Sequence, residues 1–282
     1  MVFALPRCGR ISYTNDLPVY TAIDEDALSF PGSLVADVPS ELNRALLEGQ
    51  LDISPISSAL YAAHAGELLL LPHICVGAHD AVRSIYCISA REPAALAGTT
   101  IAVTKESLTA RTLLRVICRT WYGFDPVMAE SDDPLAAYLK DGSPCLLIGD
   151  KAVDASEMLP EASLHDLGTL WRSLSGSGMV FAVWAVRAEY ARSAPEATRA
   201  VASALAASLA WGLENIEHVI RRAQRIHPRR EGFYAEYYRT LNFRLDEQAL
   251  AALVTFFASA KEAGVFREAP PLRFFEMVPQ RV

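Results

Sequence analysis

The chain has 282 residues, of which 51% are hydrophobic and 21% are charged, and its net charge is −7. This length suits one large domain or two small ones, and the hydrophobic share is that of an ordinary globular protein. The negative charge argues against a nucleic-acid partner, because surfaces that bind phosphate backbones gain their affinity mainly from Lys and Arg.

No apolar stretch reaches the ~18 residues that a membrane-spanning helix requires. Residues Met1–Arg10 lack the basic flank and apolar core of an export signal. We therefore expect a cytoplasmic protein with no membrane partner. The five cysteines are scattered and stand mostly in apolar runs, which is typical of reduced core thiols. No Cys-x-x-Cys pair, spaced His pair or Gly-rich nucleotide loop is present, so we expect no metal and no cofactor.

In the first third of the chain, short β-like runs alternate with a helical pattern, which is typical of a parallel sheet with crossover helices. Strands are predicted at residues 10–13, 34–38 and 51–56, and a helix at 39–48. Polar residues follow two of these strands. Tyr13, Thr14 and Asn15 come after the first, and Ser57 and Ser58 come after the third. The segment from Tyr13 to Asn15 is predicted to line a cleft for a small anionic molecule.

The middle of the chain repeats this alternation. Strands are predicted at 85–89, 100–103 and 145–148, with a helix that ends before Gly123. Open α/β sheets bind ligands outside the carboxyl ends of their strands, so the polar residues at these ends are expected to share one pocket. These residues are Asn15, Ser57, Thr104, Ser107 and Asp150.

The last third contains one nearly continuous apolar strand, Met179–Val186, and then becomes helical. Ser193 and Glu196 have the spacing of a capping box, which predicts a helix start there. The chain is therefore expected to form two lobes with a ligand cleft between them. Lobe I comprises residues 1–90 and 178–282, lobe II comprises 91–177, and Ser173–Gly178 is a candidate hinge.

Most of the polar candidates have two interpretations. Thr104, Ser107 and Thr109 lie between a strand and a helix, where hydroxyls and free N–H groups either hold a carboxylate or cap the helix. The same choice applies to Ser57 and Ser58. Asp150 is either a general base at the cleft or the N-cap of the helix that follows it.

Several segments in order resemble one known family. They are Gly9–Asn15 with Pro18, Leu51–Ile53 with Ile56–Ser58, Val82–Ser84, Ser107 with Thr109, Leu146–Asp150, Asp166 with Leu167 and Trp171, and Val180–Trp184. Together they resemble the chorismate dehydratases of the futalosine route to menaquinone, which look like periplasmic binding proteins turned into enzymes. The resemblance implies an α/β periplasmic-binding-protein type II-like fold. The chain departs from the usual pattern at Thr14, Gly178 and Met179.

The resemblance implies a lyase that removes water from chorismate to give 3-[(1-carboxyvinyl)oxy]benzoate. It implies catalytic roles for Asn15 and Ser84, and it likens Ser57, Ser58, Ser107 and Thr109 to the carboxylate seats of the binding-protein fold. Neither Asn15 nor Ser84 is a competent base. The substrate's own enolpyruvyl carboxylate is the expected proton acceptor, and Asp150 is the competing candidate.

Three other functions remain open from the sequence. The same two-lobed cleft serves noncatalytic solute-binding proteins, although these carry an export signal. The related 1,4-dihydroxy-6-naphthoate synthase has a similar fold but a different Asn-Asp motif near its start. The effector domain of a transcription regulator would require a helix-turn-helix, for which there is no room before the first predicted strand.

Overall fold

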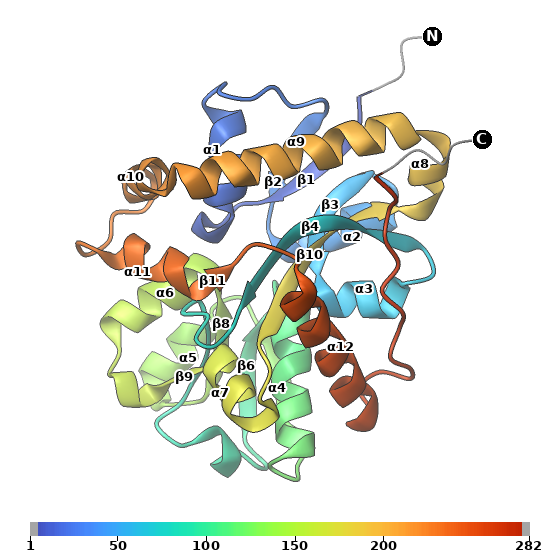
Figure 1. The fold of residues 1–282 in the computed structure, drawn as a ribbon. Helices are drawn as coiled ribbons and strands as arrows, with labels where there is room; N and C mark the ends of the chain where they lie inside the picture. Colours follow the sequence, from blue (N-terminus) through green and yellow to red (C-terminus); the bar gives the residue numbers. More distant parts are fainter. Residues whose placement is uncertain (1–4, 278–282) are drawn as a thin grey trace.

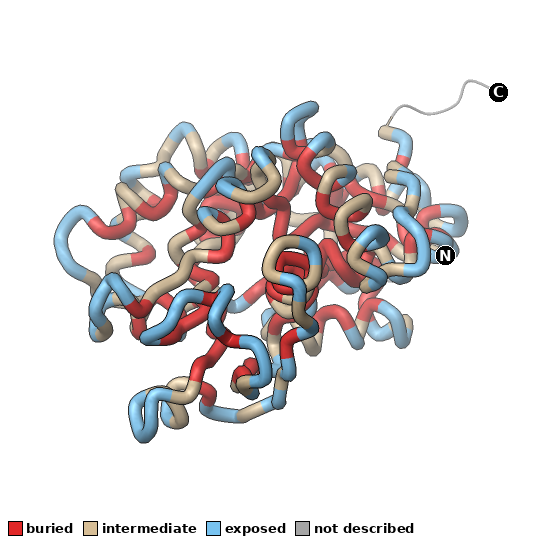
Figure 2. The backbone as a smooth tube through the Cα atoms, turned by 90° about the horizontal axis from the view of Figure 1, so that it is seen from below, coloured by how far each residue is buried: buried red, intermediate tan, exposed pale blue. Residues whose placement is uncertain are grey.

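The computed structural model describes residues 5–277 of the chain. Two β-sheets, each covered by helices, form an upper lobe I and a lower lobe II in the view of Figure 1. Buried segments run through the middle of both lobes, and the exposed loops lie at the edges (Figure 2). The α/β fold with two lobes agrees with the sequence-based expectation.

The lobe I sheet has six strands in the order β11-β4-β10-β3-β1-β2. Its strands are β1 (Arg7–Ile11), β2 (Ser33–Asp37), β3 (Ile53–Ser57), β4 (Leu68–Ala78), β10 (Met179–Arg187) and β11 (Leu241–Asn242). Strand β1 lies parallel to β2 and β3, whereas β10 is antiparallel to β3 and β4. Because β10 occupies the centre of the sheet, its sequence is almost continuously apolar and buried.

In the described part of the chain, eight α-helices belong to the same lobe. They are α1 (Leu17–Asp24), α2 (Pro39–Leu47), α3 (Ser58–His64), α8 (Ala188–Ser193), α9 (Pro195–Glu214), α10 (Ile216–Ile226), α11 (Phe233–Thr240) and α12 (Glu247–Glu262). Helix α9 packs along α1 across the top of Figure 1, and the Ser208 hydroxyl donates a 2.5 Å hydrogen bond to the Val19 carbonyl. A 3-10 turn, Thr14–Asp16, leads from β1 into α1.

The lobe II sheet has five strands in the order β7-β6-β8-β5-β9. Its strands are β5 (Ile85–Ile88), β6 (Thr100–Thr104), β7 (Val127–Ser131), β8 (Cys145–Ile148) and β9 (Leu164–Asp166). Its helices are α4 (Leu108–Thr120), α5 (Pro134–Asp141), α6 (Gly149–Met158) and α7 (Leu167–Ser175), with 3-10 turns at Pro93–Ala95 and Glu161–Ser163. Helix α12 of lobe I packs against α4 and so links the two lobes.

The chain crosses between the lobes twice, once between β4 and β5 and once between α7 and β10. Strand β5 pairs only with β8 and β9, so the sheet pairing puts the first crossover before residue 85 rather than at the expected residue 90. In the candidate hinge Ser173–Gly178, the first three residues form the end of α7. Gly176 ends that helix in the left-handed conformation, with a φ of 71°.

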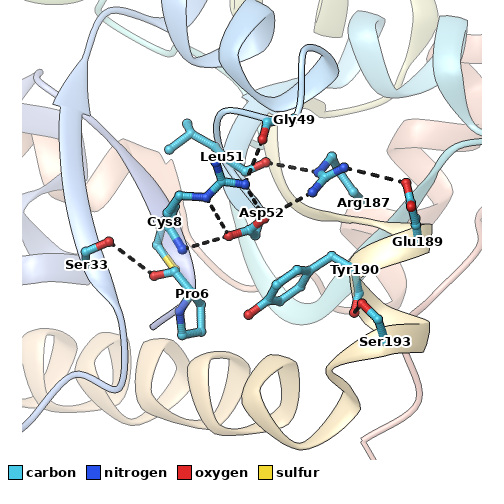
Figure 3. A network of polar contacts seen from close by, with 11 residues as sticks. Pro6, Cys8, Ser33, Gly49, Leu51, Asp52, Arg187, Glu189, Tyr190 and Ser193 are labelled. Carbon is cyan, nitrogen blue, oxygen red and sulfur yellow. Dashed lines mark hydrogen bonds and ion pairs between the residues drawn. The ribbon is translucent and has the colours of Figure 1, made fainter. Parts of the chain in front are cut away.

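A buried carboxylate joins three strands of lobe I. Asp52 precedes β3 and pairs with Arg7 of β1 and with Arg187 of β10. Figure 3 shows Arg187 beside Asp52. Its oxygens accept hydrogen bonds from Arg7 Nε at 3.0 Å, Arg7 Nη2 at 2.7 Å and Arg187 Nη2 at 3.1 Å. Burial opposes ionisation of Asp52, but the two guanidinium groups outweigh it and lower its pKa. The network therefore holds β1, β3 and β10 together, and these strands carry residues of the candidate site described below.

Two other expectations were tested by the structure. All five cysteines are buried and free, which confirms their assignment to the core. The capping box at Ser193 is wrong, because a separate helix, α8, ends at that residue. The Ser193 hydroxyl donates to the Tyr190 carbonyl of α8, and α9 begins at Pro195 after Ala194.

Within residues 5–277, none of the helices combines the length and apolar character needed to cross a bilayer. The expectation about an export signal concerned Met1–Arg10, of which the first four residues lie outside the described range.

Candidate functional site

A cavity lies between the two sheets. Residues from β1, β3, β4 and β10 of lobe I and from β5 and β8 of lobe II contribute to its wall. The apolar lining residues are Ile11, Pro39, Ile56, Val76, Val82, Ile85, Ala110, Ile148, Phe181 and Ala182.

Seven of the lining residues carry polar side chains, and they come from both lobes. These residues are Tyr13, Asn15, Ser57, Ser84, Glu106, Ser107 and Thr109. Five of the eight site residues proposed from the sequence therefore meet at one cavity. The rule about strand ends accounts for Ser57, which ends β3, and for Asn15 and Ser107, which come shortly after β1 and β6. Ser84 instead precedes β5, and Thr109 lies in the first turn of α4.

Asn15 stands on the 3-10 turn between β1 and α1. Its Oδ1 is buried and has no hydrogen-bond partner among the described residues. The backbone beside it is fixed, because the Tyr238 hydroxyl donates a 2.8 Å hydrogen bond to the Thr14 carbonyl. A buried amide oxygen without a partner is costly, and a ligand hydroxyl in the cavity would satisfy it.

Ser84 lies at the crossover into lobe II and is 2% exposed. Its hydroxyl donates a 3.3 Å hydrogen bond to the Val82 carbonyl, and its own carbonyl accepts one of 2.8 Å from the Gly149 N–H of α6. Burial raises the pKa of Tyr237, and a hydrogen bond with Ser84 partly opposes that rise. The Ser84 hydroxyl thus lies between the cavity and a buried phenol.

The other three hydroxyls on the cavity wall also have protein partners. Ser57 exchanges two hydrogen bonds with the amide of Asn43, at 3.1 and 3.2 Å. Ser107 caps α4, since its Oγ accepts from the Ala110 N–H at 3.1 Å, so the helix-capping interpretation is confirmed there. Thr109 Oγ1 accepts a 3.2 Å hydrogen bond from the Ala59 N–H and so bridges the two lobes.

Three of the proposed substrate-binding residues do not line the cavity. The buried Ser58 hydroxyl donates to the Val180 carbonyl at 2.7 Å, and Thr104 Oγ1 accepts from the Glu106 N–H at 3.3 Å. Asp150 lies in the first turn of α6, whose N-cap is Ile148, so the prediction that Asp150 caps this helix is wrong. Its carboxylate accepts from the Thr14 N–H at 3.1 Å and the Thr14 hydroxyl at 2.5 Å.

The cavity also contains polar contacts that sequence reasoning did not assign. The Tyr13 hydroxyl of lobe I donates a 2.5 Å hydrogen bond to Glu106 Oε2 of lobe II. Lys151 Nζ contacts the other carboxylate oxygen at 3.2 Å. Glu106 stands in the strand-to-helix segment that the sequence marked, but no local pattern indicates a partner 93 residues away.

Apart from the Glu106 carboxylate, the polar lining of the cavity consists of neutral groups. No Lys, Arg or His occurs among the described residues that line it, and Glu106 is the one carboxylate. Helices α4 and α6 begin at its wall, with Ser107 and Gly149. The N-terminal end of a helix carries partial positive charge and favours an anionic ligand. The arrangement suits a ligand that is held by dipoles and hydrogen bonds.

Residues 6–262 match the model of a family described as menaquinone biosynthesis. The chain belongs to this family. Over 170 residues it is 35% identical to a chorismate dehydratase of Thermus thermophilus. That match covers 54% of this chain and 60% of the length of the Thermus protein. The family resemblance derived from the sequence motifs is thereby confirmed.

Solved structures extend the comparison to the fold. A protein of Archaeoglobus fulgidus superposes with a TM-score of 0.73 at 20% identity, over 93% of this chain and 98% of that one. A Candida albicans protein described as having the generic periplasmic binding protein fold gives 0.67 at 11% identity, over 94% and 92%. The alkanesulfonate-binding protein of Xanthomonas axonopodis pv. citri, bound to MOPS, gives 0.65 at 16% identity, over 97% and 96%. The family member described here therefore has the periplasmic-binding-protein fold.

Proposed function

We propose that this protein is a chorismate dehydratase, a lyase that converts chorismate to 3-[(1-carboxyvinyl)oxy]benzoate and water for menaquinone biosynthesis. The observation that carries the proposal is the buried Oδ1 of Asn15, a residue that lines the cavity between the lobes, because this oxygen lacks a hydrogen-bond partner among the described residues. Membership of the menaquinone-biosynthesis family and the similarity to the Thermus chorismate dehydratase support it.

The reaction requires loss of the ring proton beside the enolpyruvyl ether and departure of the neighbouring hydroxyl, after which the ring is aromatic. Charge develops on the ring carboxylate as the proton leaves, so N–H and O–H donors near that group would stabilise it. The Ser57 and Ser107 hydroxyls, which accept hydrogen bonds from the protein, and the helix starts offer such donors. The Ser84 hydroxyl would offer another on leaving the Val82 carbonyl. The free Asn15 oxygen is suited to accept a hydrogen bond from the substrate hydroxyl.

The proposed base is the enolpyruvyl carboxylate of the substrate. Two protein carboxylates compete with it, and both already have partners. Asp150 accepts two hydrogen bonds from Thr14 and does not line the cavity, and Glu106 is held by Tyr13 and Lys151. This occupancy supports a substrate-assisted elimination, for which the protein supplies orientation and hydrogen bonds.

The test is to incubate the purified protein with chorismate and to follow loss of one water by mass spectrometry. Asn15→Ala is expected to lower kcat/KM by about 100-fold or more, since removal of one positioned hydrogen-bonding group in an active site has effects of that size. Ser12→Ala is the matched control, because Ser12 is exposed and lies on the same segment. Unchanged chorismate, with tight binding of another solute, would favour the solute-binding alternative instead.

A further inference from the structure

Three consecutive residues at the turn between β1 and α1 connect lobe I with lobe II and with the cavity. Tyr13 and Thr14 bond to lobe II, through Glu106 and Asp150, and Tyr13 and the next residue, Asn15, line the cavity. The turn belongs to lobe I, so these contacts form only when the lobes meet. The placement of Asn15 is therefore connected to lobe contact by its two neighbours in the chain.

Thr14 uses all of its polar groups in these contacts. Its N–H and hydroxyl donate to the two oxygens of Asp150, at 3.1 and 2.5 Å, and its carbonyl accepts from Tyr238 at 2.8 Å. Thr14 is 3% exposed, so water does not compete for these groups. Thr14 is thus held from lobe II through its N–H and hydroxyl and from α11 through its carbonyl, which belongs to the peptide group that joins it to Asn15.

The Asp150 carboxylate pairs with Thr14 rather than with a basic side chain. Farther along α6, Asp154 and Glu157 pair with Arg229, whereas no Lys or Arg within residues 5–277 forms an ion pair with Asp150. Its carboxylate instead accepts hydrogen bonds from the Thr14 donors and stands in the first turn of α6. Hydrogen bonds to a charged acceptor are about twice as strong as neutral ones.

Gly149, which precedes Asp150 in α6, holds the backbone of Ser84, the second candidate catalytic residue. The Gly149 N–H donates to the Ser84 carbonyl at 2.8 Å. Consecutive residues at the start of one lobe II helix therefore fix the backbone at Thr14, next to Asn15, and at Ser84.

We propose that Thr14 and Asp150 form a positioning pair, which holds Asn15 in its productive orientation in the cavity when the lobes are in contact. The catalytic effect of this pair rests on the proposed function, whereas its structural role, holding the backbone beside Asn15, does not. It assigns Asp150 a role through Asn15 and not as a base.

Kinetics of two variants separate these roles. Thr14→Val removes the hydroxyl but leaves the Asp150 carboxylate intact, and Asp150→Asn removes the charge. A positioning pair predicts that each lowers kcat about tenfold, with KM changed by less than about threefold, and that the double variant is no slower than either single one. Thr14→Ser restores the hydroxyl and is expected to recover turnover. A far lower kcat for Asp150→Asn than for Thr14→Val would overturn the proposal in favour of a general base.

A second measurement does not depend on chorismate. Hydrogen–deuterium exchange of the ligand-free protein is expected to be faster at residues 12–17 in Thr14→Val and Asp150→Asn, and unchanged in strand β4. Asp141→Asn, an exposed charge change in lobe II, serves as the control. Unchanged exchange at residues 12–17 would overturn the pair whatever the substrate. Faster exchange in the variants of a protein that does not convert chorismate would reject the proposed function alone.

Discussion

The Tyr13 phenol and the Glu106 carboxylate face each other across the cleft and share a 2.5 Å hydrogen bond. Burial raises the pKa of Tyr13, and the hydrogen bond to Glu106 acts in the same direction. The phenol therefore stays protonated and acts as the donor. Because Lys151 contacts the second carboxylate oxygen, the negative charge at the cavity wall is partly neutralised before a ligand enters.

Tyr13→Phe removes this hydrogen bond and keeps the ring. We expect KM for chorismate to rise about three- to tenfold with a smaller change in kcat, because lobe contact is weakened while Asn15 keeps its other supports. Steady-state kinetics check this. Tyr61→Phe is the control, since it also removes a tyrosine hydroxyl bond, from Tyr61 to the Pro271 carbonyl, within lobe I. Equal KM values for Tyr13→Phe and the wild type would contradict the prediction.

Gly149→Ala tests the close approach of the lobes. Gly149 has a φ of 63°, and a Cβ there would lie 2.7 Å from the Tyr13 ring. Gly142 has a φ of 75° with open space around it. Both substitutions are expected to cost about 1–2 kcal/mol of stability for the left-handed backbone, but only Gly149→Ala should also lower turnover. Melting curves and kcat are measured for both variants. Equal loss of stability with reduced kcat only in Gly149→Ala would show that the added methyl group disturbs the contact between the lobes, whereas equal kcat values would leave only the strain of the left-handed backbone.

Asp16 predicts an unusual dependence of stability on pH. It is fully buried next to Asn15, and its Oδ2 accepts a hydrogen bond from the Ile11 N–H while Oδ1 has no partner among the described residues. Burial raises its pKa from 3.8 to about 7, against the opposing effects of Ile11 and Arg10. A raised pKa means that the folded state binds the proton more tightly, so stability falls as pH rises from about 4 through about 7.

Asp16→Asn removes this titration. Relative to the variant, the wild type is expected to lose on the order of 2–4 kcal/mol of unfolding free energy between pH about 4 and about 8, since tenfold in proton affinity is worth about 1.4 kcal/mol. Any cost of the buried amide is independent of pH and does not affect the slope. Urea unfolding of both proteins across this range measures it, and parallel curves would refute the assignment.

The pKa of Asp52 is shifted in the opposite direction to that of Asp16. Its pKa is lowered, because the Arg7 and Arg187 hydrogen bonds outweigh its burial, so its stabilisation is present near neutral pH and is lost as pH falls below its ordinary value. Asp52→Asn is expected to cost about 1–3 kcal/mol near neutral pH, less than a fully buried pair because both arginines are partly exposed. The difference from the wild type should narrow in acid. Glu41→Gln, which breaks an exposed ion pair with Arg44, should leave the melting temperature unchanged.

The sequence predicts the two-lobed fold, and it predicts Asn15, Ser57 and Ser107 at the cavity because polar residues at or shortly after strand ends lie at the ligand-binding edge of an open α/β sheet. Ser84 precedes β5 and was indicated by the family resemblance instead. Other cavity residues lack such a signal. Phe181 and Val76 belong to antiparallel strands whose sequences are apolar on both faces, so the pattern does not reveal which side faces the cavity.

Contacts between the lobes were also beyond local reasoning. Asp150 follows a strand as a base or cap would, and its actual partner, Thr14, lies 136 residues earlier. The error at Ser193 has a different cause. A Ser-Ala-Pro-Glu segment fits a helix start, but the residues before it already form α8. The Ser193 hydroxyl therefore donates to the Tyr190 carbonyl in the last turn of α8.

The central place of β10 has a consequence for how the chain assembles. Lobe II is one continuous stretch, so it can acquire its full sheet as soon as α7 has been synthesised. Lobe I cannot, because a strand that begins at residue 179 must enter between β3 and β4, which are complete by residue 78. Contacts of such long sequence separation form slowly. Because residues of both lobes line the cavity, we expect it to form only when β10 inserts into the lobe I sheet, after lobe II has folded.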